Sequence, residues 1–261
     1  MKREGLFWGG LLVVLGVLLL LDNLGLFPPT VSAWGIFWAV VLIWIGLRGV
    51  IAGLGNRSNK TETVAIPLGQ LSTGEVRIEH GAGRLVIDGS AAPENLLNGQ
   101  FTGGVSYRVD GTRVYLAVPP YNFGFWGFTP YHALDWSVGL NRSIPLTLRL
   151  QSGASDNQIN LVDLRVTELR IEVGASSTRV TMPSRAGQTK AILKSGAAAM
   201  KVGIPEGVAA KINVQSGLSS ITINSKRFPQ IGNYYQSTDY DTAQNRVDIS
   251  VETGVGSVEI I

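Results

Sequence analysis

Cysteine is absent from this chain of 261 residues, and histidine occurs only as His80 and His132. A chain without cysteine has neither a disulfide framework nor thiol chemistry. The two histidines lie 52 positions apart with no ligand spacing around them, so a zinc site would need carboxylates for almost all its ligands. The sequence therefore argues against a metal site.

Motifs of catalysis are missing as well. The chain has no Gly-x-Ser-x-Gly elbow and no Walker loop, and Gly81-Ala-Gly83 lacks the third glycine of a dinucleotide fingerprint. His80 precedes a glycine where the equivalent segments carry small or medium-sized residues, which is typical of a turn position. We therefore expect no enzyme activity, no catalytic residue and no cofactor.

Charged residues are scarce, at 16% of the chain, and the excess of positive charge lies at one end. Residues 1–60 carry a net charge of +3, whereas residues 61–261 hold 17 basic and 17 acidic side chains. The basic excess is therefore a sign of membrane topology rather than a nucleic-acid footprint, and we expect no nucleic-acid partner.

Two stretches of 17 residues, Gly5–Leu21 and Val31–Leu47, contain no charge. As a helix each spans roughly 26 Å, close to the ~30 Å hydrocarbon core of a bilayer. We predict a transmembrane helical hairpin in residues 1–56, with spans at about 5–22 and 31–50 in the lipid bilayer. A cleaved signal peptide is the alternative for the first stretch, although the second follows at once. Because both ends of the hairpin are basic, the remaining chain is predicted to be cytoplasmic, and the extracellular side stays open as the alternative.

A strand-turn-strand pattern recurs six times from Val76 onward, and each copy is centred on a glycine. Apolar residues stand five and three positions before each glycine and six positions after it, with mostly polar residues between them. This alternation has the period of a β-strand with one buried face. Glycine at a sharp turn provides either a positive φ or room for a neighbouring backbone. The predicted turn glycines are Gly81, Gly153, Gly174, Gly196, Gly217 and Gly254.

The spacing of these units predicts that they stack as coils. Intervals of 21, 22 and 21 residues separate the glycines from Gly153 to Gly217, a normal length for one turn of a β-solenoid. We predict a mainly β fold, with a single-domain β-solenoid in residues 57–261 after the transmembrane hairpin; a set of unrelated hairpins is the alternative. The longer intervals indicate insertions at residues 119–143 and 226–243, and Asp110-Gly111 predicts the turn of a hairpin in residues 104–118.

One segment carries more aromatic residues than the repeat requires. It lies beside prolines and glycines that forbid a regular helix. If exposed, it would form a sticky surface for a partner or a membrane; the alternative is a cap that covers an end of the solenoid. The candidate contact residues are Tyr121, Phe123, Phe125, Trp126, Phe128, Tyr131 and Trp136.

Both parts of the chain resemble known families. The membrane region of LiaI and LiaF-type proteins is similar to the segments Leu6-Phe-Trp-Gly-Gly-Leu-Leu-Val-Val-Leu-Gly16 and Leu21-Asp-Asn-Leu-Gly-Leu-Phe27. The toast-rack β-repeat domains of bacterial cell-envelope stress proteins resemble the remainder, with Ile144-Pro-Leu-Thr-Leu-Arg-Leu-Gln-Ser-Gly-Ala and Glu252-Thr-Gly-Val-Gly-Ser-Val-Glu-Ile. The chain departs from LiaF-type proteins in having two predicted spans, where those proteins commonly have more.

The resemblance implies a non-enzymatic integral membrane protein that regulates or scaffolds cell-envelope stress signalling through protein–protein contacts. Its partner would be another membrane or envelope protein, with a sensor kinase among the candidates. Two alternatives remain. One is a surface-facing, adhesin-like module that binds envelope polymer or lipid, and the other is a structural scaffold that forms a homo-oligomer through its open coil ends.

Overall fold

The computed structural model describes residues 38, 61–119 and 134–261. The chain divides into two units, Met1–Arg57 with Phe123–Pro130, and Ser58–Asn122 with Tyr131–Ile261. Within the described residues, no helix has the length and apolar character needed to cross a membrane. Apart from residue 38, both predicted spans lie outside those residues.

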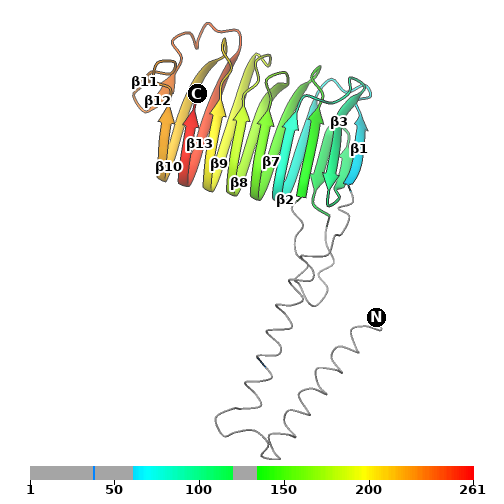
Figure 1. Ribbon diagram of the computed structural model, residues 1–261. Helices are drawn as coiled ribbons and strands as arrows, with labels where there is room; N and C mark the ends of the chain where they lie inside the picture. The colour runs from blue at the N-terminus through cyan, green and yellow to red at the C-terminus, as the bar shows by residue number, and fades with distance from the viewer. Residues whose placement is uncertain (1–37, 39–60, 120–133) are drawn as a thin grey trace, which may run out of the picture. The chain divides into compact units, whose positions relative to one another are not determined.

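The second unit is one mainly β structure built on a sheet of 13 strands (Figure 1). Its main path runs in the order β1-β3-β6-β2-β7-β8-β9-β13-β10-β12-β11, and β5 adds β4 beside β2. The strands are β1 (Thr61–Pro67), β2 (Gly74–Asp88), β3 (Asn95–Thr102), β4 (Ser106–Asp110), β5 (Arg113–Ala117), β6 (Leu134–Leu140), β7 (Pro145–Asn160), β8 (Arg165–Thr181), β9 (Gln188–Gly203), β10 (Ala209–Ile223), β11 (Gln230–Ile231), β12 (Tyr234–Gln236) and β13 (Arg246–Ile260).

Six long strands form the predicted stack of coils. Each of β2, β7, β8, β9, β10 and β13 has 15 to 17 residues and bends sharply at its glycine, so that one strand supplies both layers of the stack. Neighbouring coils pair in parallel with their repeat positions aligned, as in Ile78 with Leu150 and Leu150 with Ile171. These pairings exclude a set of unrelated hairpins.

The core lies between the two layers and consists of the apolar columns seen in the sequence. Three positions before the glycine, the side chains are at most 1% exposed in the five inner coils, in Ile78, Leu150, Ile171, Leu193 and Val251. Because alternate residues of a strand point to opposite faces, the polar residues between these columns lie outside. The period-2 pattern therefore predicts the inward and outward faces correctly.

The glycines at the bends are required by close packing of backbones, not by a left-handed conformation. None of the six has a positive φ. A Cβ on Gly153 would lie 2.6 Å from the carbonyl oxygen of Gly81, and one on Gly254 would lie 2.7 Å from that of Gly196. From the second coil onward, each bend therefore stacks directly on a neighbouring bend, where a Cβ would meet a backbone oxygen at 2.6 to 3.3 Å.

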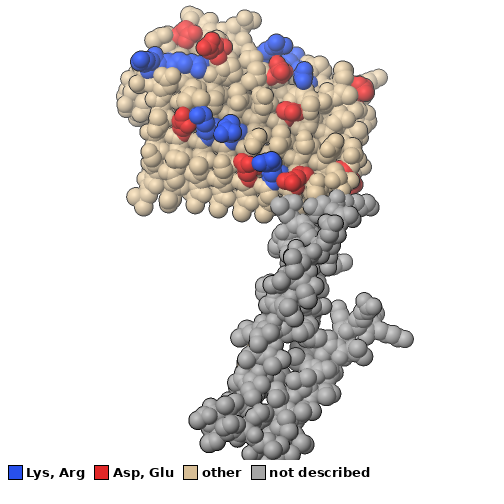
Figure 2. Space-filling view, in the orientation of Figure 1, with Lys and Arg blue, Asp and Glu red and all other residues tan. Residues whose placement is uncertain are grey.

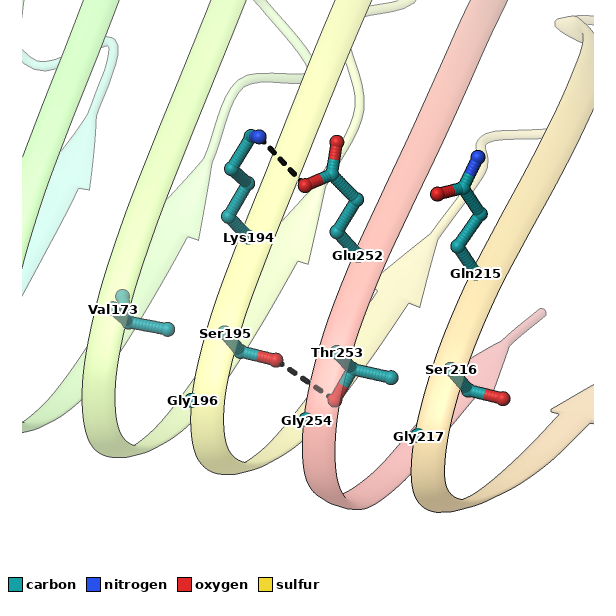
Figure 3. Close-up of a pocket in the computed structure, with 10 residues that line it drawn as sticks. All are labelled: Val173, Lys194, Ser195, Gly196, Gln215, Ser216, Gly217, Glu252, Thr253 and Gly254. Carbon is teal, nitrogen blue, oxygen red and sulfur yellow. Dashed lines mark hydrogen bonds and ion pairs between the residues drawn. The ribbon is translucent and has the colours of Figure 1, made fainter.

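The order of the coils differs from their order along the chain. Equal spacing predicts that β10 follows β9, but β13 lies between them and pairs in parallel with both (Figure 3). The two possible neighbours of β9 differ in charge. Lys194 and Lys201 of β9 pair with Glu252 and Glu259 of β13 at 2.6 and 3.0 Å. The facing positions of β10 are Gln215 and Thr222, which offer no such partner.

The predicted second insertion is the connection that makes this order possible. Residues between β10 and β13 carry the chain past the end of the stack and include β11 and β12, which pair with each other. The guanidinium of Arg227 donates hydrogen bonds to three backbone carbonyls, those of Ile204, Pro205 and Val208, at 2.5, 2.6 and 3.3 Å. The connection is thus fastened to the loop before β10.

The other end of the stack is covered by additional strands. The predicted hairpin forms as β4 and β5, with Gly111 at φ 56° in its turn, and β5 pairs with the first half of β2. On the second layer, β6 pairs in parallel with β2, and β3 and β1 follow in antiparallel pairing. β6 falls inside the predicted insertion at residues 119–143, yet it belongs to the sheet.

Candidate functional site

The structure places one of the seven candidate contact residues, Trp136, in the core. Its side chain is 1% exposed, and its ring packs edge-on against Phe101 at 5.1 Å between centroids. Trp136 is therefore a core residue and not a surface contact, because its position on β6 points it between the layers. The other six, Tyr121, Phe123, Phe125, Trp126, Phe128 and Tyr131, lie outside the described residues.

His80 is also a core residue, where the sequence indicates only a turn. It is 3% exposed, its Nε2 lies 3.2 Å from the carbonyl oxygen of Leu134, and its ring contacts that of Trp136 at 5.2 Å. Burial lowers the pKa of His80 below its ordinary value, opposed by the Leu134 carbonyl and the charge of Asp135. A neutral imidazole therefore fits this position best.

A shallow trough follows the bends of the coils. Since each bend has a glycine in place of a side chain, the backbone forms its floor (Figure 3). Two adjoining hollows of about 430 and 460 Å³ make up this trough, and they meet at Val173. Together they cross all six coils, and we call this feature the glycine trough. In the five inner coils the residue before the glycine is buried and closes the floor from below, as Ser195 and Thr253 do at 9% and 6% exposure, whereas Ser216 in the outermost coil is exposed.

A ladder of polar side chains forms one wall of the glycine trough. They stand two positions before each glycine, aligned from coil to coil by the parallel register. Gln151 donates a hydrogen bond to Glu172 at 3.0 Å, and Lys194 forms its ion pair with Glu252. In spatial order the ladder is Glu79, Gln151, Glu172, Lys194, Glu252 and Gln215.

Electrostatics make this wall mixed in sign. Arg170 donates to Glu172 at 2.5 Å, and this hydrogen bond is the main reason why the pKa of Glu172 lies below its ordinary value. The ladder holds three carboxylates and one ammonium group, and Arg77 and Arg170 pair with Glu79 and Glu172, so the wall has no net excess of either sign. On the opposite layer, Lys and Arg likewise lie beside Asp and Glu in short mixed groups (Figure 2). Such a surface presents polar contacts without a strong field of one sign.

Metal binding gains no support from the described part of the chain. No three His, Cys, Asp or Glu side chains in residues 61–119 and 134–261 are arranged to hold an ion. What the described arrangement offers chemically is a row of repeated hydrogen-bonding groups above a bare backbone floor.

A second feature, which sequence reasoning missed, is the outer edge of β10. Among the described residues, β10 pairs along its length with β13 but with β12 only at Lys211 and Ile212. Residues 213–223 therefore present an unpaired strand edge, and Leu218 beside it is 84% exposed. The signal was available in the sequence, because these eleven residues contain no charged side chain and no histidine.

Bent parallel strands, stacked on a glycine column, define this protein as a β-repeat protein of the solenoid class. The chain belongs to the toast-rack family: the family described as the N-terminal domain of toast_rack, DUF2154, matches residues 55–203. The LiaF transmembrane domain matches residues 7–72, in the order that the resemblance predicts. The protein is therefore associated with a membrane through its amino-terminal region.

A solved structure shares the fold at low sequence identity. A candidate cell adhesion protein from Clostridium sporogenes ATCC 15579 superposes with a TM-score of 0.68 at 21% identity, over 77% of this chain and 98% of its own. A candidate adhesin from Bacteroides fragilis NCTC 9343 has a TM-score of 0.30 and 10% identity over 78% of this chain and 98% of its own, a likeness too weak to bear on the fold. No curated protein matches the chain.

Proposed function

We propose that this protein is a non-enzymatic membrane scaffold that regulates cell-envelope stress signalling through protein–protein contacts. The observation that carries the proposal is the union in one chain of a LiaF transmembrane domain and a toast-rack domain. The architecture supports it, because a stack of equivalent coils supplies a rigid, repetitive surface and no enclosed pocket by itself.

The glycine trough is the surface that suits such contacts within the described residues. Its hydrogen-bonding groups repeat at the spacing of neighbouring strands, about 4.8 Å, over six coils. An extended segment of a partner protein lying along the trough would meet a carboxylate, amide or ammonium group at each coil. Binding by such a row of modest contacts is typical of a reversible regulatory interaction.

Deletion of the gene, with a reporter for the envelope-stress response, tests the regulatory role. If the protein restrains a sensor, the reporter rises without stress in the deletion strain and returns to its basal level when the full chain is restored. A reporter that is unchanged by deletion, with and without stress, would contradict the proposal.

A matched pair of variants tests whether the glycine trough makes the contact. Glu252 and Glu259 lie on the same strand, pair with Lys194 and Lys201, and have side chains 44% and 45% exposed, but only Glu252 lines the trough. Glu252→Arg should therefore fail to restore normal signalling, whereas Glu259→Arg should restore it. Equal behaviour of the two variants at equal protein levels would remove the trough from the mechanism.

We further propose a hairpin of two membrane spans within residues 1–56, with the toast-rack domain in the cytoplasm. The basic residues at both ends of the hairpin support this orientation. An alkaline phosphatase fusion after Ile261 should be inactive in cells, since that enzyme needs an oxidising compartment. An active fusion would place the domain outside and exclude contact with the catalytic half of a kinase.

A second candidate function is an adhesin-like module for envelope polymer or lipid. The length and openness of the glycine trough favour it, since an extended polymer could follow the coils as well as a peptide could. The fold is shared with a candidate cell adhesion protein, which is consistent with this role without assigning it. Binding of the purified full chain to isolated envelope polymer, lost in Glu252→Arg and kept in Glu259→Arg, would favour this function.

The aromatic segment is proposed as a further contact for a partner or the bilayer, with the cap as its alternative. Serine at Phe123, Phe125 and Trp126 together should leave the β-sheet spectrum unchanged and abolish association if the segment is a contact. Loss of the fold in this triple variant would instead favour the cap.

A further inference from the structure

We propose that the outer edge of β10 pairs with β10 of a second copy of this chain, so that two stacks join end to end in a twofold dimer. This pairing is a matter of assembly and is independent of the signalling role.

β10 differs from β4 and β1, the two edge strands at the opposite end of the stack. An unpaired strand edge invites other strands, and proteins usually blunt such edges with short strands, charges or proline. β4 has five residues and carries Arg108 and Asp110, and β1 has seven residues with Glu62 and a terminal Pro67. By contrast, β10 has 15 residues, and its unpaired part has no charge and no proline. Figure 2 shows the left margin of the stack, over β10, in tan below the basic group at the top.

The apolar core is incompletely covered at β10. Val214, Ile221 and Ile223 occupy the inward columns whose members in the other coils are at most 2% exposed, but these three are only partly buried. Each inner coil is covered on both sides, whereas residues 213–223 of β10 pair only with β13 within the described part of the chain. A further coil at this edge would bury the three side chains, which favours association through apolar area.

The absence of charge on this edge favours a second copy of the same chain as its partner. In a twofold interface the same strand edge of each copy faces the other copy. A strand with charges of one sign would therefore place like charges near one another. Each of the other five coils has at least two charged residues in the equivalent stretch of eleven, and β10 has none. An uncharged edge of alternating small polar and apolar residues can pair with itself without repulsion. Twofold symmetry makes this pairing antiparallel.

Mass measurement on the full chain in detergent tests the proposal. The wild-type protein should have twice the mass of one chain, and Leu218→Lys with Ser220→Lys should raise its dissociation constant on the order of tenfold, because each copy then brings two positive charges to an edge that has none. The matched control is Tyr107→Lys with Val109→Lys at the other end, where the replaced side chains are 51% and 49% exposed. This control should leave the dimer intact.

Cysteine crosslinking in membranes locates the contact, since the native chain has no cysteine. Single cysteines at positions 214 to 222 should form a crosslinked dimer most strongly at one position and less on either side of it, as antiparallel self-pairing requires. A cysteine in place of Val109 should give none.

Three results would overturn the proposal. The first is the mass of a single chain without crosslinking at any edge position. The second is a dimer that both lysine variants leave unchanged, which would place the contact on another surface, such as the membrane region. The third is crosslinking of the edge cysteines to a different protein, which would make a foreign strand the occupant.

Discussion

Replacing the stacked glycines by alanine should destabilise the protein in proportion to how closely the neighbouring bend approaches. A Cβ on Gly153 would stand 2.6 Å from the carbonyl oxygen of Gly81, which is backbone and cannot move aside alone. Overpacking of this kind costs about 1–3 kcal/mol, offset by about 0.4–1 kcal/mol because alanine restricts the unfolded chain. The net loss for Gly153→Ala is therefore about 1–2 kcal/mol, which lowers the Tm by roughly 2–8 °C in a domain of this size.

Gly81 and Gly174 complete the series. A Cβ on Gly81 would meet only side-chain methyl groups at 3.8 and 3.9 Å, so Gly81→Ala should be neutral or stabilise by up to about 1 kcal/mol. Gly174→Ala, with a carbonyl oxygen at 3.1 Å, should fall between the two. Thermal unfolding of the full chain in detergent, followed by the β-sheet circular dichroism signal, measures the order. If Gly153→Ala and Gly81→Ala had the same Tm, close approach of the bends would not be the reason for glycine.

Three further outcomes follow from single side chains. Between neutral pH and pH 5 the Tm should fall, because burial lowers the pKa of His80 and the histidine of the unfolded chain, with a pKa near 6.5, takes up a proton first. His80→Phe should make the dependence of Tm on pH shallower, and an unchanged dependence would assign it to other groups. Arg227→Ala should cost about 1.5–3 kcal/mol, since it removes the charged donor to three carbonyls, and hydrogen exchange should quicken between β10 and β13; unchanged exchange there would refute the fastening role. Lys194→Ala should cost less than about 1 kcal/mol in urea unfolding, because its pair with Glu252 is 38% and 44% exposed; a loss above 2 kcal/mol would contradict this.

Much of the fold is predictable from the sequence because one physical requirement repeats in every coil. A column such as Ile78, Leu150 and Ile171 must be apolar to fill the space between the layers, and a bend such as that at Gly153 must lack a Cβ. Both requirements act on single positions at fixed spacing, so they can be predicted from the sequence. The turn at Asp110-Gly111 can be predicted as well, because its signal lies in two adjacent residues.

The environments of His80 and Trp136 were not predictable in this way. His80 stands at a position where other copies have small or medium-sized residues, and it is covered by the added strand β6. Trp136 belongs to β6 itself, outside the repeated columns, and is buried against Phe101 and His80. Burial there depends on which strand covers the first coil, a long-range fact that no local pattern reports. The aromatic composition around Trp136 left surface contact and a cap as alternatives, but its side chain fills the space against Phe101 instead.

The order of the coils shows which information the hydrophobic pattern lacks. Every coil has the same apolar columns, so burial alone would accept β10 or β13 beside β9 equally well. Lysines at positions 194 and 201 break the tie, since only β13 places glutamates opposite both of them. Each exposed ion pair is weak alone, but β10 in the place of β13 would offer only Gln215 and Thr222. A small difference in free energy then decides the order, because both orders bury similar apolar area. With β13 beside β9, β10 becomes the outermost coil. The charges that favour this order therefore also determine which strand edge remains free to pair.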